Sequence, residues 1–426
     1  MGIIIFLTLV LIEIALTTYS IITKSNHTKE RSITIIASFI VFLLLVILQI
    51  VEWSPVYYLL VAYLLLSAII GVIKIIRGSV EERKYKTTKS VLKTIGLIIL
   101  IFLVTLPTIL FPQNKSVIKT TGDYQILTKT YTYIDKSRIE TYSDKGENRK
   151  LNIQIWYPDN LDKTYPLIVF SHGGLGVKSS NESLYKELAS HGYVVGSIDH
   201  TYQCFYTKDD KGATTFIDLG YMEELSKEDA RTNPQNSYEL YQKWMGIRMD
   251  DIGFVIDNIK EEAKDNNADL VYRIIDTNRI GVMGHSLGGS AALGMGRIRD
   301  DISAVIALEA PFMYDIEGLR DGQFVFRDDK YPIPVLNIYS DSAWDILGKR
   351  PQYAANYEMI SDSIHISGVG HLGLTDFALT SPILTNFLDR GKSSSKNSIS
   401  ILERINEECL EFFNSYLKME GEFLLN

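Results

Sequence analysis

One short motif places a serine among small residues, in the pattern of a catalytic nucleophile. It reads Gly-His-Ser-Leu-Gly at residues 284–288, after the strand pattern 279–283 and before the small residues 289–293. This order predicts a strand, a tight turn and a helix, which together form the nucleophile elbow of an α/β-hydrolase. Glycines let the neighbouring backbone approach closely in such a turn. Ser286 is therefore the predicted nucleophile.

An oxyanion hole needs two backbone N–H groups that face the charge formed when an ester carbonyl is attacked. Leu287, directly after the serine, supplies one of them by its position. The second is expected in Ser-His-Gly-Gly-Leu-Gly at residues 171–176, which follows the apolar stretch 167–170. Gly174 is the preferred donor and Leu175 the alternative, because the double glycine leaves the register open.

The general base is expected beyond the last strands, because this fold uses the chain order serine, acid, histidine. Of the seven histidines, only His365 and His371 follow the serine motif. His365 falls within an alternating strand pattern, whereas His371 follows a glycine-rich turn after that strand. Catalytic loops lie at the carboxyl ends of parallel strands, so His371 is the predicted base.

The acid has three candidates on the residues alone. Glu309 ends the apolar pattern 304–308, and Asp341 and Asp345 follow the next apolar pattern, 335–339. Acidic residues after strands are also common in solvated loops. The more usual hydrolase arrangement takes the acid from the later strand, which slightly favours Asp341.

The elements that must position these residues alternate along the chain from about residue 125. Strand patterns lie at 131–134, 151–157, 167–170, 194–198, 280–283, 304–308 and 335–339, and helix patterns at 181–191, 236–264, 287–299, 351–360 and about 399–418. The alternation predicts the α/β class, with a mostly parallel sheet covered on both faces. The polar stretch 203–235 lacks clear periodicity and is expected to be an insertion or lid, and 391–398 an exposed loop.

Four apolar runs open the chain, at roughly residues 3–22, 33–51, 56–73 and 94–112. About 20 residues at about 1.5 Å each cross the hydrocarbon layer of a bilayer. The sequence therefore predicts a four-helix transmembrane region over residues 1–112 and an α/β-hydrolase domain over 113–426. Glu13, inside the first run, is a costly residue there, and no role is assigned to it.

Basic residues near the spans indicate their orientation. The first and third connections carry eight (Lys24, Lys29, Arg31, Arg77, Arg83, Lys84, Lys86 and Lys89), the second carries none, and the stretch after the last span carries three (Lys115, Lys119 and Lys129). The first and third connections are therefore expected in the cytoplasm. A multi-pass protein of the cell membrane follows, with both termini and the hydrolase domain on the extracytoplasmic side.

Charge and cysteine content exclude several classes of function. Residues 1–112 carry a net charge of +5 (ten Lys/Arg and five Glu), and the remainder −13. An acidic domain argues against a nucleic-acid partner. Two cysteines, Cys204 and Cys409, exclude a disulfide scaffold and a cysteine-rich metal site. Two unpaired buried thiols are expected, and a single bridge between them is the alternative.

Several short motifs occur together in the order found in one enzyme family. They are Phe-Ser-His-Gly at 170–173, Leu-Ala-Ser-His-Gly-Tyr at 188–193, the serine motif extended to Gly289, Ile-Ala-Leu-Glu-Ala at 306–310, and His371 followed by Asp376 and Phe377. Residues of about 150–390 thus resemble the secreted, plasma-type platelet-activating-factor acetylhydrolases and their bacterial relatives. The resemblance implies calcium-independent hydrolysis of ester bonds, commonly of short or oxidised acyl chains on phospholipids. It also implies a serine, an acid and a histidine that act without a metal, so no metal and no cofactor are expected.

The same resemblance moves the predicted acid to Glu309, with Asp341 as the alternative, because the family acid lies in an Ala-Leu-Asp-Ala context after the strand that follows the elbow helix. Three features depart from the family pattern: Glu in place of Asp, an additional glycine in the oxyanion turn, and the four apolar runs.

The sequence therefore predicts hydrolysis of lipid or phospholipid-like esters through an acyl-enzyme, on a chain whose partners are its ester substrate and the bilayer. The alternatives are an acyltransferase or peptidase of the same fold, and a non-enzymatic membrane sensor that binds a ligand.

Overall fold

The computed structural model describes residues 1–77, 85–112, 118–358, 363–393 and 397–418. The chain forms two compact units: Met1–Lys115 with Thr380–Leu384, and Ser116–Leu379 with Thr385–Asn426. Arg83, Lys84, Lys115, the end of the predicted helix 351–360 and the centre of the predicted loop 391–398 lie outside the described residues. The domain boundary predicted at 112/113 adjoins such a stretch and stays a prediction.

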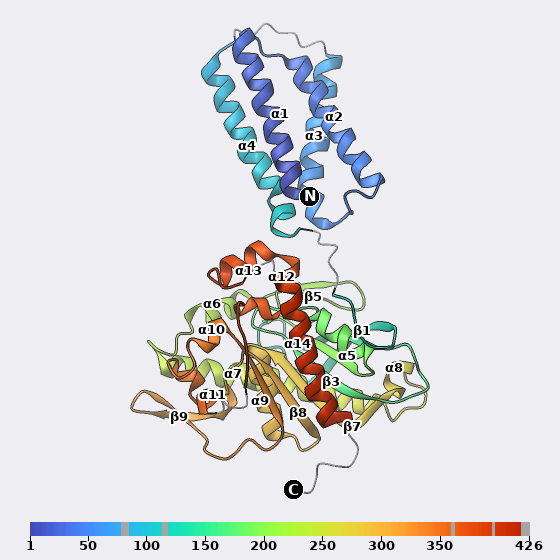
Figure 1. The fold of residues 1–426 in the computed structure, drawn as a ribbon, viewed down its shortest axis with the longest axis vertical. Helices are drawn as coiled ribbons and strands as arrows, with labels where there is room; N and C mark the ends of the chain where they lie inside the picture. The colour runs from blue at the N-terminus through green and yellow to red at the C-terminus, as the bar shows by residue number, and fades with distance from the viewer. Residues whose placement is uncertain (78–84, 113–117, 359–362, 394–396, 419–426) are drawn as a thin grey trace. The chain divides into compact units, whose positions relative to one another are not determined.

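The first unit consists of long apolar helices (Figure 1). They are α1 (Gly2–Thr23), α2 (Thr28–Ile47), α3 (Tyr58–Ile76) and α4 (Thr87–Leu110), with a 3-10 turn η1 (Pro55–Tyr57) before α3. All four spans are long and apolar enough to cross a membrane. α2 and α4 begin five and seven residues before the predicted apolar runs, because their polar first turns are helical although not apolar. The unit packs mainly as α1 against α4 and α2 against α3.

Polar side chains inside this unit bind one another. Arg31 donates to the Glu13 carboxylate at 2.9 Å and to the Thr17 hydroxyl at 2.8 Å, and the hydroxyls of Thr17 and Thr94 lie 2.6 Å apart. These contacts connect α1, α2 and α4. A buried carboxylate among apolar helices needs a partner of opposite charge, and Arg31 provides it. The ion pair gives Glu13 a structural role.

The second unit is built on an eight-stranded sheet with the order β1-β2-β4-β3-β7-β8-β11-β12. Its strands are β1 (Ile126–Ile139), β2 (Asn148–Pro158), β3 (Tyr165–Ser171), β4 (Val194–His200), β7 (Ile275–His285), β8 (Ile302–Leu308), β11 (Val335–Ser340) and β12 (Ser363–Ile366). The pairs β1–β2 and β2–β4 are antiparallel, and all the others are parallel. The predicted fold class is confirmed: a mostly parallel α/β-hydrolase sheet, preceded in the chain by four apolar helices.

Further helices, single turns and two hairpins lie between and after these strands in the chain. The helices are α5 (Glu182–Ser190), α6 (Leu219–Lys227), α7 (Pro234–Glu262), α8 (Leu270–Arg273), α9 (Leu287–Ile298), α10 (Asp341–Trp344), α11 (Ala354–Glu358), α12 (Phe377–Thr380), α13 (Pro382–Leu388) and α14 (Ser398–Phe413). Single turns are η2 (Met313–Asp315), η3 (Pro351–Tyr353), η5 (Leu372–Leu374) and the π-turn η6 (Asn414–Lys418). Two hairpins pair β5 (Tyr206–Lys208) with β6 (Thr214–Phe216), and β9 (Ile316–Arg320) with β10 (Gln323–Phe326).

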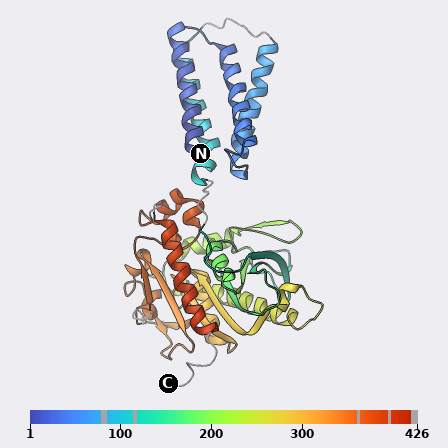
Figure 2. The ribbon, with the colours of Figure 1, turned by 45° about the vertical axis from the view of Figure 1, so that its right-hand side comes forward.

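Helices bury both faces of the sheet, because successive strand residues point to opposite faces. In β3, Leu167 and Val169 join the core beneath α7 and α9, whereas Ile168 and Phe170 join the core beneath α5 and α14. Figure 2 shows α14 crossing one face of the sheet. Cys204 and Cys409 are buried and free, as the sequence predicted.

Candidate active site

Ser286 lies between β7 and α9 in a backbone conformation that residues other than glycine rarely adopt. Its φ is 53° and its ψ −124°. Such a conformation costs roughly 1–3 kcal/mol and persists only where the surroundings enforce it. The glycines around it have no room for a side chain: a Cβ on Gly284 would lie 2.4 Å from the backbone of Gly288, and one on Gly289 2.6 Å from Cβ of Ala310. The motif therefore forms a strained elbow at the carboxyl end of β7, an inner strand of the sheet.

Backbone contacts fix this elbow to the two neighbouring strands. The N–H of Ser286 donates to the backbone oxygen of Leu308 at the end of β8, at 2.8 Å. On the other side, a Cβ on Gly288 would lie 2.0 Å from the backbone oxygen of Ser171 at the end of β3. The serine is thus held where the carboxyl ends of three parallel strands meet.

His371 and Glu309 come from separate segments that follow β12 and β8, and their side chains meet beyond the carboxyl ends of these strands. Nδ1 of His371 lies 2.8 Å from Oε1 of Glu309. Glu309 directly follows β8, with a φ of 50°, and is 3% exposed. Its other carboxylate oxygen accepts the backbone N–H of Ser340 at 2.9 Å. Because an ionised carboxylate only accepts hydrogen bonds, Nδ1 carries the ring proton and Nε2 is left as the basic nitrogen.

The surroundings make His371 more basic than an ordinary histidine. Burial lowers the pKa of His371, but the charge and the hydrogen bond of Glu309, with a smaller contribution from Asp389, outweigh burial and raise that pKa. The side chain of His371 keeps 34% exposure, so its ring can still reach a substrate. This arrangement can orient an imidazole and stabilise the imidazolium that forms when it takes a proton.

His285 links the elbow to the histidine loop. Its ring centroid lies 4.5 Å from that of His371, and its Nε2 lies 3.1 Å from the backbone oxygen of His371. Burial, and then the neighbouring His371, lower the pKa of His285 well below its usual value, so this ring is neutral and donates from Nε2. Within the described part of the chain, no hydrogen bond joins the Ser286 hydroxyl itself to His371. His285, the residue before Ser286, thus connects the elbow to His371 by direct contact.

Asp341, the alternative acid, directly follows Ser340, but its carboxylate binds a different histidine. Its carboxylate contacts Nε2 of His365 at 2.8 Å and accepts the N–H of Gly368 at 2.8 Å. The His365 ring also stacks on Trp344, with centroids 4.5 Å apart. Asp345 forms an exposed ion pair with Lys392. Asp341 thus pairs with His365, whereas Glu309 pairs with His371, the predicted base.

The expected oxyanion donors lie on the two backbone segments around the serine. Leu287 begins α9, where N–H groups have no partner within the helix. Gly173 lies against the elbow, since a Cβ there would be 3.4 Å from Cβ of Ser286. Gly174 follows it, and a Cβ on that residue would be 3.4 Å from the Leu225 side chain of α6. Leu175, the alternative donor, carries a side chain that is 55% exposed.

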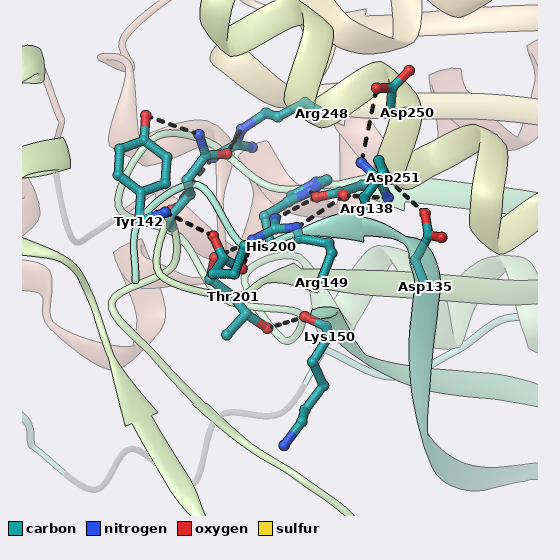
Figure 3. Close-up of polar contacts among 12 residues, drawn as sticks. Asp135, Arg138, Tyr142, Arg149, Lys150, His200, Thr201, Arg248, Asp250 and Asp251 are labelled. Atoms are coloured by element: carbon teal, nitrogen blue, oxygen red, sulfur yellow. Dashed lines mark hydrogen bonds and ion pairs between the residues drawn. The ribbon is translucent and has the colours of Figure 1, made fainter. Parts of the chain in front are cut away.

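A second series of serine, histidine and aspartate is buried at the end of β3, and Figure 3 shows its His200 and Asp251 with Arg149. The Ser171 hydroxyl contacts Nε2 of His200 at 2.8 Å, and Nδ1 of His200 contacts Asp251 at 2.8 Å. Burial raises the pKa of Asp251, but Arg149, which binds both carboxylate oxygens, outweighs burial and holds that pKa well below its usual range. All three side chains are fully buried, so they support the end of β3 rather than meet a substrate.

One group of metal-ligand side chains stands out among the described residues. His172, Asp199 and Cys204 are buried, and their donor atoms lie within 4.8 Å of one another. The Asp199 carboxylate is already bound by Lys178 and by Thr207, each at 2.6 Å. Burial raises the pKa of the Cys204 thiol and so favours its neutral form, which is a poor metal ligand. These residues fit a hydrogen-bonded core cluster better than a metal site.

Comparison with known proteins identifies relatives over most of the second unit. The family model of platelet-activating factor acetylhydrolase, isoform II, matches residues 140–424. The platelet-activating factor acetylhydrolase of Canis lupus familiaris is 25% identical over 284 residues, which are 62% of this chain and 60% of that protein. That of Cavia porcellus is 26% identical over 281 residues, with 62% and 61% covered. The chain thus spans about 60% of the length of these relatives.

Two further likenesses concern other esterases. Cutinase est1 of Thermobifida alba is 29% identical over 154 residues, 36% of this chain and 38% of that protein. The solved structure of a ferulic acid esterase from Streptomyces cinnamoneus superposes with a TM-score of 0.53 at 20% identity, and covers 73% of this chain and 95% of its own. At that identity the likeness shows the fold alone. The family resemblance predicted from the short motifs is confirmed by the family match.

Proposed function

The chain belongs to the platelet-activating factor acetylhydrolase isoform II family, and on this premise we propose that it is a serine-dependent carboxylic ester hydrolase. The substrates that we propose are lipid or phospholipid-like acyl esters, the class to which the relatives' names point. One observation carries the proposal: the hydrogen-bonded pair of Glu309 and His371 lies beside the strained turn that holds Ser286.

The proposed reaction is acyl transfer through a covalent intermediate. Ser286 attacks the ester carbonyl while Nε2 of His371 takes its proton and later returns it to the leaving alcohol. Glu309 keeps the ring proton on Nδ1 and stabilises the imidazolium. The N–H groups of Leu287 and Gly174 bind the oxyanion, and water then releases the carboxylic acid. The residues of the chain account for each of these steps without a cofactor.

The four apolar helices make membrane association part of the same proposal. We propose that residues 1–112 form a multi-pass anchor and that residues 113–426 form the catalytic domain, with residues 203–235 acting as a lid. We propose that the first and third connections, where basic residues gather, lie in the cytoplasm, and that the catalytic domain lies on the extracytoplasmic side. A domain held at a bilayer meets lipidic esters at high local concentration.

This orientation predicts that protease added to intact cells removes an epitope tag placed after Asn426. A tag inserted at Asn26, in the first connection, is the matched control and is expected to stay protected until the membrane is permeabilised. Immunoblots against both tags make the measurement. Protection of the C-terminal tag together with digestion of the tag at Asn26 would reverse the topology.

The function is tested with the purified full-length protein in lipid nanodiscs, supplied with soluble esters and phospholipid esters of graded acyl length. We expect release of the free acid, and a loss of about 10⁶ in kcat in Ser286→Ala. Ser290→Ala is the matched control, because Ser290 lies one turn further along α9, fully buried, with a hydroxyl that has no hydrogen-bond partner among the described residues. Undiminished hydrolysis in Ser286→Ala would refute the proposal, and transfer of the acyl group to added alcohols alone would make the protein an acyltransferase.

The raised pKa of His371 predicts the pH dependence of turnover. The ring must be neutral to accept the serine proton, so kcat/KM should rise with pH as His371 loses its proton. Because Glu309 raises that pKa, the midpoint is expected above the ordinary histidine value of about 6.5. The measurement is a pH profile of kcat/KM on an ester that does not titrate. A midpoint clearly below that value would contradict the role given to Glu309.

A further inference from the structure

A buried guanidinium lies behind the expected oxyanion turn. Arg248 comes from the middle of α7, and its side chain has 0% exposure. In the described part of the chain its hydrogen bonds go to neutral oxygens rather than to a carboxylate. Burying a charge costs several kcal/mol unless hydrogen bonds replace its water. The groups that Arg248 binds therefore indicate the function of its buried charge.

The guanidinium binds two successive carbonyl groups of the turn. Nη1 donates to the backbone oxygen of His172, and Nη2 lies 3.4 Å from the backbone oxygen of Gly173. On its other sides, Nε donates to the side-chain oxygen of Gln203 at 3.2 Å, and Nη2 lies 3.4 Å from the Tyr221 hydroxyl. The shorter contact is to the oxygen of His172, and the contact to Gly173 is longer. Figure 3 shows the Arg248 side chain near Tyr142 and His200.

The ring of His172 holds the same peptide from a second direction. The backbone N–H of His200 donates to Nε2 of His172 at 3.3 Å, so Nδ1 carries the ring proton and donates to the oxygen of Gly173 at 2.6 Å. Burial, and then the charge of Arg248, lower the pKa of His172 well below its usual value and keep the ring neutral. The N–H of Gly176 is a third donor to this oxygen, at 3.1 Å.

The direction of one N–H group follows from these contacts. In a trans peptide the C=O and the N–H point in opposite directions. Arg248 of α7, the His172 ring and the N–H of Gly176 all hold the oxygen of Gly173, so the N–H of Gly174 points away from these three donors. Gly173 itself lies against the elbow, where a Cβ on it would be 3.4 Å from Cβ of Ser286. The held peptide therefore borders the serine.

We propose that Arg248 is a positioning residue of the oxyanion hole, whose guanidinium fixes the direction of the Gly173–Gly174 peptide and whose charge polarises that peptide toward the oxyanion. The inference rests on the proposed ester hydrolysis and adds a residue outside the triad to it. Arg248 acts through Gly174 and does not touch the substrate. An arginine suits this task because its planar fork carries five donors and stays charged.

The test compares an oxygen ester with the matching thionoester, in which sulfur replaces the carbonyl oxygen. Sulfur is a weak hydrogen-bond acceptor, so the thionoester gains little from an oxyanion hole. In Arg248→Met, kcat/KM for the ester is expected to fall about 100-fold, mostly in kcat, while the thionoester loses less than about tenfold. The ratio of the two rates, measured on one preparation, does not depend on the fraction of folded enzyme.

Arg297→Met is the matched control, because the side chain of Arg297 is only 6% exposed but pairs with Asp315 and Asp329. It is expected to lower thermal stability and to leave the ester-to-thionoester ratio at the wild-type value. If Arg248→Met does not fold, Arg248→Lys decides, since it keeps the charge but loses the fork, and its ratio should lie below wild type. An unchanged ratio in the folded variant overturns the inference. Absence of any Ser286-dependent hydrolysis in the wild type would instead refute the proposed function, and the inference with it.

Discussion

Glu309→Gln is expected to lower kcat by about 10⁴, with little change in KM. In the native site one carboxylate oxygen accepts the N–H of Ser340 and the other accepts Nδ1–H of His371. In the variant the amide oxygen would keep the bond to Ser340, which turns the NH₂ group toward His371. That donor favours the tautomer with the proton on Nε2, the nitrogen that must accept the proton of Ser286. The measurement is steady-state turnover of an ester by the purified variant.

Asp341→Asn provides the matched comparison for this result. Asp341 contacts His365 and Gly368 rather than His371, so its amide variant is expected to keep most of the activity. Both changes are isosteric and remove one carboxylate from a residue that directly follows a strand. A nearly inactive Asp341→Asn beside an active Glu309→Gln would reassign the acid.

Gly288→Ala is expected to abolish turnover and to destabilise the second unit by on the order of 3 kcal/mol or more. A Cβ at this position would lie 2.0 Å from the backbone oxygen of Ser171 and 2.5 Å from that of His172. Neither oxygen belongs to a flexible side chain, so the elbow must move away from β3. Such a shift displaces Ser286 from the oxyanion turn as well. Thermal unfolding and ester turnover, measured together, check the prediction.

Gly246→Ala separates this effect from the general consequence of replacing glycine. Gly246 lies on the exposed side of α7, and a Cβ on it would have no described neighbour within 4 Å. Alanine in an exposed helix interior is more favourable than glycine by about 1 kcal/mol, so this variant should be more stable and fully active. If Gly288→Ala behaved in the same way, the close packing of the elbow would not be required.

The elbow could be predicted from the sequence because local packing determines it. The glycines of residues 284–289 are required by contacts within the turn and with the adjacent strands, and such contacts leave a short motif. The strands were predictable for a similar reason, since burial on both faces of the sheet gives short runs of Val and Ile. The acid was different: Glu309 and Asp341 both follow parallel strands, and the family resemblance, not the residues themselves, favoured Glu309.

Contacts between distant segments explain what the sequence did not reveal. Arg248 and Asp251 lie on α7, where charged side chains usually form a solvated face, and only tertiary packing buries them. Residues 203–235 show no clear periodicity, yet they form the β5–β6 hairpin and α6. Strands of three residues are too short to produce a pattern, and they pair only with each other.

The central claim, that His371 and Glu309 make the hydroxyl of Ser286 reactive, is tested most directly by labelling with a fluorophosphonate and mapping the adduct by mass spectrometry. One adduct is expected, on the peptide that contains residues 284–288, and its rate of formation should fall by orders of magnitude in His371→Gln and not in His365→Gln. An adduct on another serine, or labelling of Ser286 that does not depend on His371, would contradict the account.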